Sequence, residues 1–231
     1  MKIEKVQNKH LGSELAAELF IEKSNRFPKD PVGLATGETM RGVYEELARL
    51  KFSPQFDHAF ALDEYQGISK DSQNSYWSEL NQNFSQLLSW GGKLHVPGRD
   101  DYQGEQGLRD FEKAISEKGP ISVQLLGLGT NGHVAFNEPG SEFDSLTRVV
   151  ELHDETRLAN SRFFSSIDEV PETAVTQGLA TIAKAESLLL LVFGEAKRHA
   201  LVSALENPNE NTPLASLLSH KDLTLITDLE I

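Results

Sequence analysis

The sequence of 231 residues contains no cysteine. This absence excludes disulfide bonds, a thiolate nucleophile and a zinc or iron–sulfur site held by cysteine. Long apolar runs are also missing: none approaches the roughly 18–20 residues that span a bilayer, and the first residues, MKIEKV, lack the apolar segment of a secretory signal. We therefore expect a cytoplasmic protein that has no membrane partner.

Basic residues are few, since 22 Lys and Arg stand against 35 Asp and Glu and give a formal net charge of −13. A field of this sign repels polyanions, so we expect no nucleic acid partner. One small phosphate group is compatible with this charge, because backbone N–H groups and one or two cationic side chains are enough to hold it.

Metal-binding patterns are missing as well. The histidines show neither the H-E-x-x-H spacing nor a pair of histidines four residues apart. We therefore expect no metal site. The scattered histidines are His10, His58, His95, His153, His199 and His220.

Apolar runs alternate with amphipathic stretches along the whole chain. We expect strands at Met1–Val6, Pro31–Leu34, His58–Leu62, Ile121–Leu126, Thr147–Leu152, Ser187–Phe193 and Leu223–Thr227. We expect helices at Ser13–Arg26, Met40–Leu50, Ser75–Leu88, Gly104–Lys118, Thr173–Lys184 and Glu195–Leu205. Strands that are apolar on both faces and separated by helices are typical of a covered parallel sheet. The prediction is an α/β fold: a single doubly wound, mostly parallel, Rossmann-like sheet with helices on both faces.

The length is compatible with one large or two small domains, and we expect a single domain over residues 1–231. Only Asn207–Pro213 has a linker-like composition, and we interpret it as a surface loop because too little chain follows it for a second domain. In a doubly wound sheet the ligand binds beyond the carboxyl ends of the strands. This rule selects the loops Ala35–Thr39, Asp63–Gly67 and Gly127–Gly140.

The first of these loops lies between a predicted strand and a predicted helix. Its backbone N–H groups and the hydroxyls of Thr36 and Thr39 form a candidate phosphate cradle. It is not a Walker A loop, because the lysine of that motif is absent. The alternative interpretation is a glycine turn in which threonine caps the helix.

The second loop begins with two adjacent acids, Asp63 and Glu64. Side chains alternate across a strand, so at most one of the two carboxylates faces a pocket directly. One catalytic base is the functional interpretation, and a solvated pair at a strand end is the alternative.

The third loop matches the dinucleotide fingerprint G-x-G-x-x-G at Gly127, Gly129 and Gly132. A dinucleotide site needs a helix that starts in this loop, whereas the sequence N-E-P-G breaks the chain a few residues later. The loop instead offers an imidazole, a carboxamide and a carboxylate for proton transfer. We favour this function over a structural turn.

Taken together, these segments resemble the glucosamine-6-phosphate deaminase/isomerase family in order and spacing over nearly the whole chain. The most specific segment is Asn131–Gly140, N-G-H-V-A-F-N-E-P-G. The other resembling segments are Leu34–Gly37, Leu62–Tyr65, Thr156–Phe164, Val170–Pro171, Thr176–Gly178 and Gly194–Lys197.

The resemblance implies an enzyme without an organic cofactor that converts an amino sugar phosphate to fructose 6-phosphate and ammonia. It implies that Asp63 moves a proton between C2 and C1, and that His133 opens the sugar ring with Glu138 and Asn131 beside it. An amide cannot relay a charge, so we expect Asn131 to orient the imidazole. We also expect desolvation or lid closure to raise the pKa of Asp63, because a carboxylate is a weak base.

By the same resemblance Gly127 offers backbone near the substrate, and the stretch at about 147–170 is a mobile lid. The residues implied around the phosphate are Thr36, Gly37, Glu38, Thr39, Arg162 and Lys197.

The sequence departs from the family pattern at three positions. Glu38 and Met40 stand where the family usually has a small residue and a proline, and we expect the Glu38 carboxylate to turn outward onto a lysine or arginine. Val150 replaces a basic residue found next to Arg148 in allosteric members. Shorter members of the family, which this chain resembles in length, tend to be unregulated and often monomeric, so we expect an unregulated monomer, with a dimer as the alternative.

Three other functions remain open at this stage. The first is a deaminase for another hexosamine phosphate, and the second is a 6-phosphogluconolactonase, which does not need Asp63 as a C2 base. The third is a sensor of sugar phosphates, which in the family's relatives carries a DNA-binding module and has typically lost the catalytic residues. The four candidate catalytic residues are all present here, so we favour an enzyme.

Overall fold

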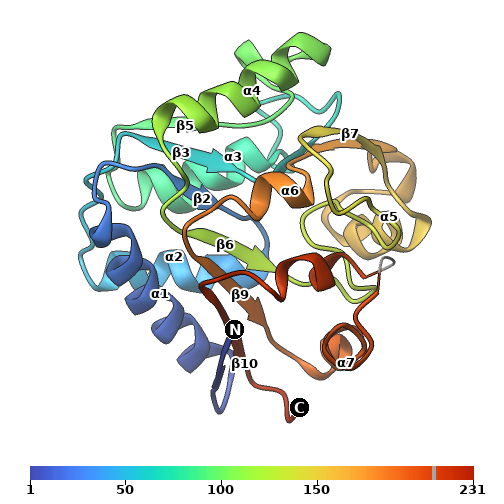
Figure 1. Cartoon of the computed structure of the whole chain (residues 1–231). Coiled ribbons are helices and arrows are strands. Elements are labelled where there is room, and N and C mark those ends of the chain that lie inside the picture. Colours follow the sequence, from blue (N-terminus) through green and yellow to red (C-terminus); the bar gives the residue numbers. More distant parts are fainter. Residues whose placement is uncertain (210–211) are drawn as a thin grey trace.

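A seven-stranded parallel sheet forms the centre of the computed structural model, which describes residues 1–209 and 212–231. The strand order is β1-β10-β9-β6-β2-β3-β5, and every neighbouring pair is parallel (Figure 1). The strands are β1 (Lys2–Lys5), β2 (Val32–Leu34), β3 (His58–Ala61), β5 (Lys93–His95), β6 (Gln124–Gly127), β9 (Leu188–Val192) and β10 (Leu223–Thr227). Strands β2, β9 and β10 are buried at every residue, as their short apolar runs predict.

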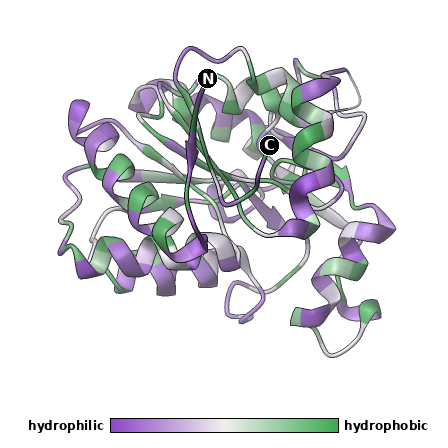
Figure 2. Cartoon of the chain, turned by 90° about the horizontal axis from the view of Figure 1, so that it is seen from below, coloured by the Kyte–Doolittle hydropathy of each residue, from purple (hydrophilic) through white to green (hydrophobic). Residues whose placement is uncertain are grey.

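Helices lie on both sides of this sheet, and the strands between them are mainly hydrophobic (Figure 2). The α-helices are α1 (Lys9–Arg26), α2 (Glu38–Arg49), α3 (Tyr76–Leu80), α4 (Gly104–Lys118), α5 (Asp154–Asn160), α6 (Leu179–Ile182) and α7 (Arg198–Glu206). A π-helical segment, η1 (Asn81–Gln86), continues α3, so the predicted helix at Ser75–Leu88 is present in two parts. The doubly wound, mostly parallel α/β fold expected from the sequence is confirmed.

The direction of winding reverses between β6 and β2, which lie side by side in the sheet. The chain proceeds from β2 to β3 and β5 on one side, and from β6 to β9 and β10 on the other. Such a reversal opens a crevice at the carboxyl ends of the two strands. The loops after β2 and β6 therefore flank the position where this fold binds its ligands.

A second, antiparallel sheet of three strands packs next to the first and has the order β4-β8-β7. Its strands are β4 (Asp63–Tyr65), β7 (Arg148–Glu151) and β8 (Thr173–Thr176). It has a small hydrophobic cluster of its own, in which Tyr65, Phe136 and Leu152 are buried and Val150 packs against them. β7 and α5 form one side of the molecule in Figure 1.

The prediction of a helix at Thr173–Lys184 is wrong for the first half of that segment. Thr173–Thr176 is strand β8, and only Leu179–Ile182 is helical. Two threonines and a valine in four residues favour a strand, and β8 is held by ladders on both sides. At Gly178 a Cβ atom would lie 2.1 Å from the backbone oxygen of Ser145, so this glycine allows the close approach that separates strand from helix.

The sequence analysis also missed strands β4 and β5, and it placed the end of the third predicted strand at Leu62. The predicted surface loop Asn207–Pro213 contains residues 210–211, which lie outside the described residues; residues 207–209 are exposed. Among the described residues, no helix has both the length and the apolar composition that crossing a bilayer requires.

A chain of buried hydrogen bonds joins β3 and β5. His58 Nδ1 lies 3.0 Å from His95 Nε2, and His95 Nδ1 lies 2.5 Å from the hydroxyl of Tyr102. The ring of His95 stacks on Phe60 with a centroid separation of 4.4 Å. Burial lowers the pKa of His95 to about 4, and repulsion from His58 and Lys93 adds to the effect.

This shift predicts a pH dependence of stability. The unfolded chain binds a proton at His95 near the ordinary histidine pKa of 6.5, whereas the folded chain does so only near 4. Between these values acid favours the unfolded state. We expect the unfolding free energy of the native protein to fall between pH 6.5 and 4 by about 2 kcal/mol more than that of His95→Gln, as measured by urea denaturation. The variant His10→Gln, at an exposed site, serves as the control, and an equal fall in all three proteins would contradict the prediction.

Candidate active site

A cavity of about 580 Å³ opens at the carboxyl ends of β2, β3 and β6, where the winding reverses. Its volume lies in the range of small-molecule sites. Nine of the eleven predicted site residues line it: Thr36, Gly37, Glu38, Thr39, Asp63, Gly127, His133, Arg162 and Lys197. The other two, Asn131 and Glu138, are not among its lining residues and lie behind His133.

Asp63 is the first residue of β4, directly after the end of β3, and it lines the cavity. Its exposed fraction is only 7%. Burial raises the pKa of Asp63 well above its usual range, and the nearby charges of Glu64 and Glu79 raise it further. This is the desolvation that a carboxylate base at this position is expected to need.

Glu64 points the other way and is fully engaged by its neighbours. Its carboxylate accepts hydrogen bonds from the backbone N–H groups of Tyr76 and Trp77, at 3.0 and 3.1 Å, and forms an ion pair with Arg99 at 2.6 Å. The two acids therefore face opposite sides, as strand alternation predicts. Glu64 has a structural role, and of these two acids only Asp63 lines the cavity.

His133 is oriented by a line of two hydrogen bonds. Its Nδ1 lies 2.7 Å from Asn131 Oδ1, and the Asn131 amide donates to Glu138 Oε2 at 2.8 Å. The Glu138 carboxylate accepts the amide hydrogen, so the amide presents its oxygen to the imidazole and Nδ1 carries the proton. This tautomer leaves Nε2 unprotonated for chemistry, and burial lowers the pKa of His133, which keeps the ring neutral.

Gly129 lets the imidazole lie against the backbone of its own loop. A Cβ atom at this position would lie 2.3–2.5 Å from three atoms of the His133 ring. The backbone N–H of Gly129 also donates to the His133 carbonyl at 2.8 Å. The glycine pattern therefore serves the histidine. No helix starts in residues 128–140 of the described chain, so the dinucleotide interpretation is excluded.

The phosphate loop leads into the N-terminus of α2. Gly37 precedes the helix with φ +96°, a conformation that favours glycine, and the first residues of α2, Glu38 and Thr39, line the cavity with it. Glu38 turns its carboxylate away onto Lys9 at 3.3 Å, and this contact lowers the pKa of Glu38. The outward orientation expected for Glu38 is confirmed.

Cationic side chains converge on this loop from three elements. Arg41 comes from α2, Arg162 from the segment after α5, and Lys197 from the segment before α7. Burial lowers the pKa of Lys197, and repulsion from Lys9 and Arg162 lowers it further. A group of cations that disfavour one another in this way is stabilised by an anion among them.

The sequence analysis missed several residues that line the cavity. Tyr76 and Glu79 of α3 contribute to the wall beside Asp63, and Arg41 adds a cation. Tyr76 belongs to a predicted helix whose amphipathic pattern does not show which face meets a ligand. Glu79 carried no signal in the sequence, because a single glutamate on a helix is most often a solvated residue.

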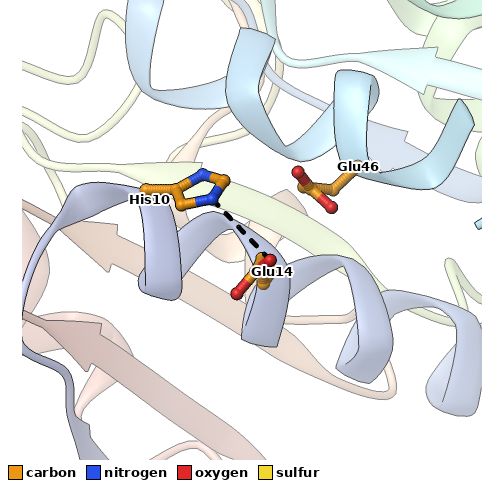
Figure 3. Close-up of side chains that lie close together, drawn as sticks. All are labelled: His10, Glu14 and Glu46. Carbon is orange, nitrogen blue, oxygen red and sulfur yellow. Dashed lines mark ion pairs between the residues drawn. The ribbon is translucent and has the colours of Figure 1, made fainter. Parts of the chain in front are cut away.

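A second group of titratable side chains lies outside the cavity, between α1 and α2. His10 and Glu14 of α1 and Glu46 of α2 place their ligand-type atoms within 4.8 Å of one another (Figure 3). Arg49 forms ion pairs with both Glu46 and Glu14. The group is therefore an ion-pair network that joins two helices, and the absence of a metal site stays a prediction.

The sequence of the chain matches a known family over most of its length. Residues 10–226 match the family of glucosamine-6-phosphate isomerases/6-phosphogluconolactonase. The chain belongs to this family. The expectation drawn from the Asn131–Gly140 segment is thereby confirmed.

Curated relatives cover the chain from end to end. Glucosamine-6-phosphate deaminase 1 of Bacillus subtilis (strain 168) is 39% identical, over 100% of this chain and 98% of that protein. Glucosamine-6-phosphate deaminase of Shouchella clausii (strain KSM-K16) is 40% identical, over 100% of this chain and 96% of that protein.

Solved structures agree with this assignment. A monomeric glucosamine-6-phosphate deaminase superposes with a TM-score of 0.91 at 38% identity, covering 98% of this chain and 97% of that one. A 6-phosphogluconolactonase from Thermotoga maritima superposes with a TM-score of 0.76 at 22% identity, covering 98% of each chain. The second likeness shows a shared fold only.

The opposite surroundings of Asp63 and Glu64 predict opposite effects on stability. Asp63→Asn removes a charge that burial disfavours, so we expect it to leave unchanged or raise the free energy of unfolding at pH 7. Glu64→Gln leaves Arg99 buried without its partner, and we expect a loss of about 3 kcal/mol. Urea denaturation of the two variants measures both effects, and a larger loss in Asp63→Asn than in Glu64→Gln would contradict the assignment.

Proposed function

We propose that this protein is a glucosamine-6-phosphate deaminase, which converts glucosamine 6-phosphate to fructose 6-phosphate and ammonia. One observation carries the proposal: a single cavity joins a buried carboxyl group, an oriented neutral imidazole and a cationic helix N-terminus. The names of the relatives at about 40% identity support it. Retention of the complete set of candidate catalytic residues favours an enzyme over a sensor.

The first step in this mechanism is opening of the sugar ring. The neutral His133 takes the proton of the anomeric hydroxyl at Nε2 and returns a proton to the ring oxygen, which gives the open-chain aldehyde. Asn131 and Glu138 hold the ring in the required tautomer through the two hydrogen bonds. Their role is positioning, because neither lines the cavity.

The second step is proton transfer from C2 to C1. Only the open-chain aldehyde makes the C2 proton acidic, and the Asp63 carboxylate removes it. Return of that proton to C1, together with transfer of a proton from the C2 nitrogen to O1, leaves nitrogen double-bonded to C2 and a hydroxyl group on C1. Water then adds at C2, and ammonia leaves to give the ketone. The raised pKa of Asp63 strengthens it as a base.

A lactonase is a weaker candidate for this chain. Hydrolysis of a lactone needs no carbon acid step, so it gives no reason to bury a carboxyl group at Asp63. The lactonase structures resemble the chain at 15–22% identity, against 38% for the deaminase. The identity of the hexosamine is part of the proposal, and a parallel assay of the galactosamine and mannosamine phosphates discriminates among them.

We further propose that the stretch at about 147–170 acts as a lid. Asn160, Arg162 and Phe163 from this stretch line the cavity, and Phe163 is 49% exposed, so its ring has apolar surface left to bury when the lid moves inward. The proposal includes a cytoplasmic monomer that needs no cofactor. The monomeric deaminase with a TM-score of 0.91 supports the oligomeric state.

Asp63→Asn tests the proton transfer. We expect the variant to lose at least about a thousandfold in ammonia release and in exchange of the C2 hydrogen with solvent, because an amide cannot accept the proton. The binding of a substrate analogue should change by less than about threefold. Ammonia release and deuterium exchange are measured on the same sample. Exchange that survives in the variant would assign the base to another residue.

His133→Gln tests the ring-opening step. We expect turnover of the cyclic substrate to fall by at least about a hundredfold, since the general base that opens the ring is removed. Binding of an open-chain polyol phosphate, which needs no opening, should stay within about threefold of the native value by calorimetry. Equal losses in turnover and in polyol binding would show that His133 maintains structure only.

A further inference from the structure

The carboxylate of Glu79 occupies a position at the phosphate loop. Its Oε1 accepts a hydrogen bond from the backbone N–H of Gly37 at 2.9 Å. Glu79 comes from α3 and lines the same cavity as Asp63 and the loop. An anion supplied by the chain itself is thus bound at the N-terminus of α2.

The two glutamates near this loop are oriented in opposite directions. Glu38 faces outward and pairs with Lys9, whereas Glu79 faces the loop and takes its N–H. The cations Arg41, Arg162 and Lys197 line the same cavity as the loop. Glu79 therefore stands where a substrate anion would find its donors.

A phosphate bound to these donors and the Glu79 carboxylate exclude each other. A backbone N–H makes one strong hydrogen bond, so Gly37 cannot serve both anions at full strength. Two anions at hydrogen-bonding distance from one donor also repel each other. Phosphate binding at Gly37 therefore requires Glu79 to turn away.

We propose that Glu79 is a specificity-determining residue that competes with the phosphate group of the substrate for the Gly37 N–H. The proposal rests on the proposed function, because it assumes a phosphorylated substrate in this cavity. The competition weakens binding of every phosphate-containing compound by the free energy of displacing the carboxylate. Binding of compounds that lack phosphate does not require this displacement. Glu79 therefore reduces the difference in affinity between phosphorylated and free sugars.

The cavity offers the displaced carboxylate other partners. Asn74, Gln82 and Asn83 also line the cavity, and their side-chain amides can donate hydrogen bonds. Gln82 and Asn83 come three and four residues after Glu79 in the helical segment that continues α3, a spacing at which side chains are neighbours. Glu64 fixes that helix by accepting from the N–H groups of Tyr76 and Trp77.

Glu79→Gln tests the competition without altering size. Glutamine keeps an oxygen for the Gly37 N–H but has no charge, so phosphate displaces it more easily. We expect the dissociation constant of inorganic phosphate, measured by calorimetry, to fall at least fivefold. The KM for glucosamine 6-phosphate should fall by a similar factor.

A matched control removes one negative charge from α2, the helix that follows the phosphate loop. Glu45→Gln, at an exposed position of α2, changes the net charge equally and should leave phosphate binding within twofold. A second variant, Glu79→Ala, removes the competing carboxylate and its hydrogen bond together and should also tighten phosphate binding at least fivefold. Thermal unfolding of each variant establishes that it is folded.

The measurements distinguish failure of this inference from failure of the proposed function. Phosphate binding that is unchanged, changed by less than fivefold, or weaker in folded Glu79→Gln overturns the inference and makes Glu79 a permanent cap of α2. Absence of ammonia release in the native protein overturns the function alone, because the phosphate calorimetry needs no turnover. A native protein that binds no inorganic phosphate, with a folded Glu79→Gln that binds none either, overturns the inference as well.

Discussion

The buried ion pair between Glu64 and Arg99 is the interaction on which the geometry of the cavity depends. Arg99 approaches from the segment after β5, so the pair joins β4 to the edge of the main sheet. The side chains of Glu64 and Arg99 are only 2% and 11% exposed, and an unpaired charge at such a site is strongly disfavoured. The need to satisfy both charges fixes β4, and thereby the direction in which Asp63 points.

The same carboxylate also sets the opposite wall of the cavity. Glu64 accepts the N–H groups at the start of α3, and an anion at a helix N-terminus is favourable. That short helix carries Glu79, which reaches Gly37 at the start of α2. One buried acid thus connects the candidate base to the phosphate loop through the backbone of α3 and the hydrogen bonds that Glu64 and Glu79 accept. Glu64 therefore has a structural role. Because Glu64 makes these contacts, the adjacent Asp63 is left to face the cavity.

The sequence predicted every strand of the main sheet except β5, but of the small sheet it predicted only β7. β9 and β10 could be predicted because runs such as Leu188–Val192 are apolar on both faces and too short for a buried helix. β4 and β8 could not, because each depends on pairing with segments far along the chain, Asp63 with Thr176 and Thr176 with Arg148. Such pairing is a tertiary contact that local periodicity does not contain. His133, Asn131 and Glu138 were predictable as a set because they share one loop.

Glu79 illustrates what local pattern leaves out, and it bears on how an acidic protein binds an acidic substrate. The net charge of −13 disfavours approach of a phosphate from far away, but salt screens this field beyond about 8 Å at physiological ionic strength. Inside that distance, Arg41, Arg162, Lys197 and the α2 N-terminus determine the potential. Two negative charges about 4 Å apart interact with roughly 4 kcal/mol at an effective dielectric near 20. The turning of one carboxylate, Glu79, therefore has more influence on phosphate affinity than the distant surface acids together.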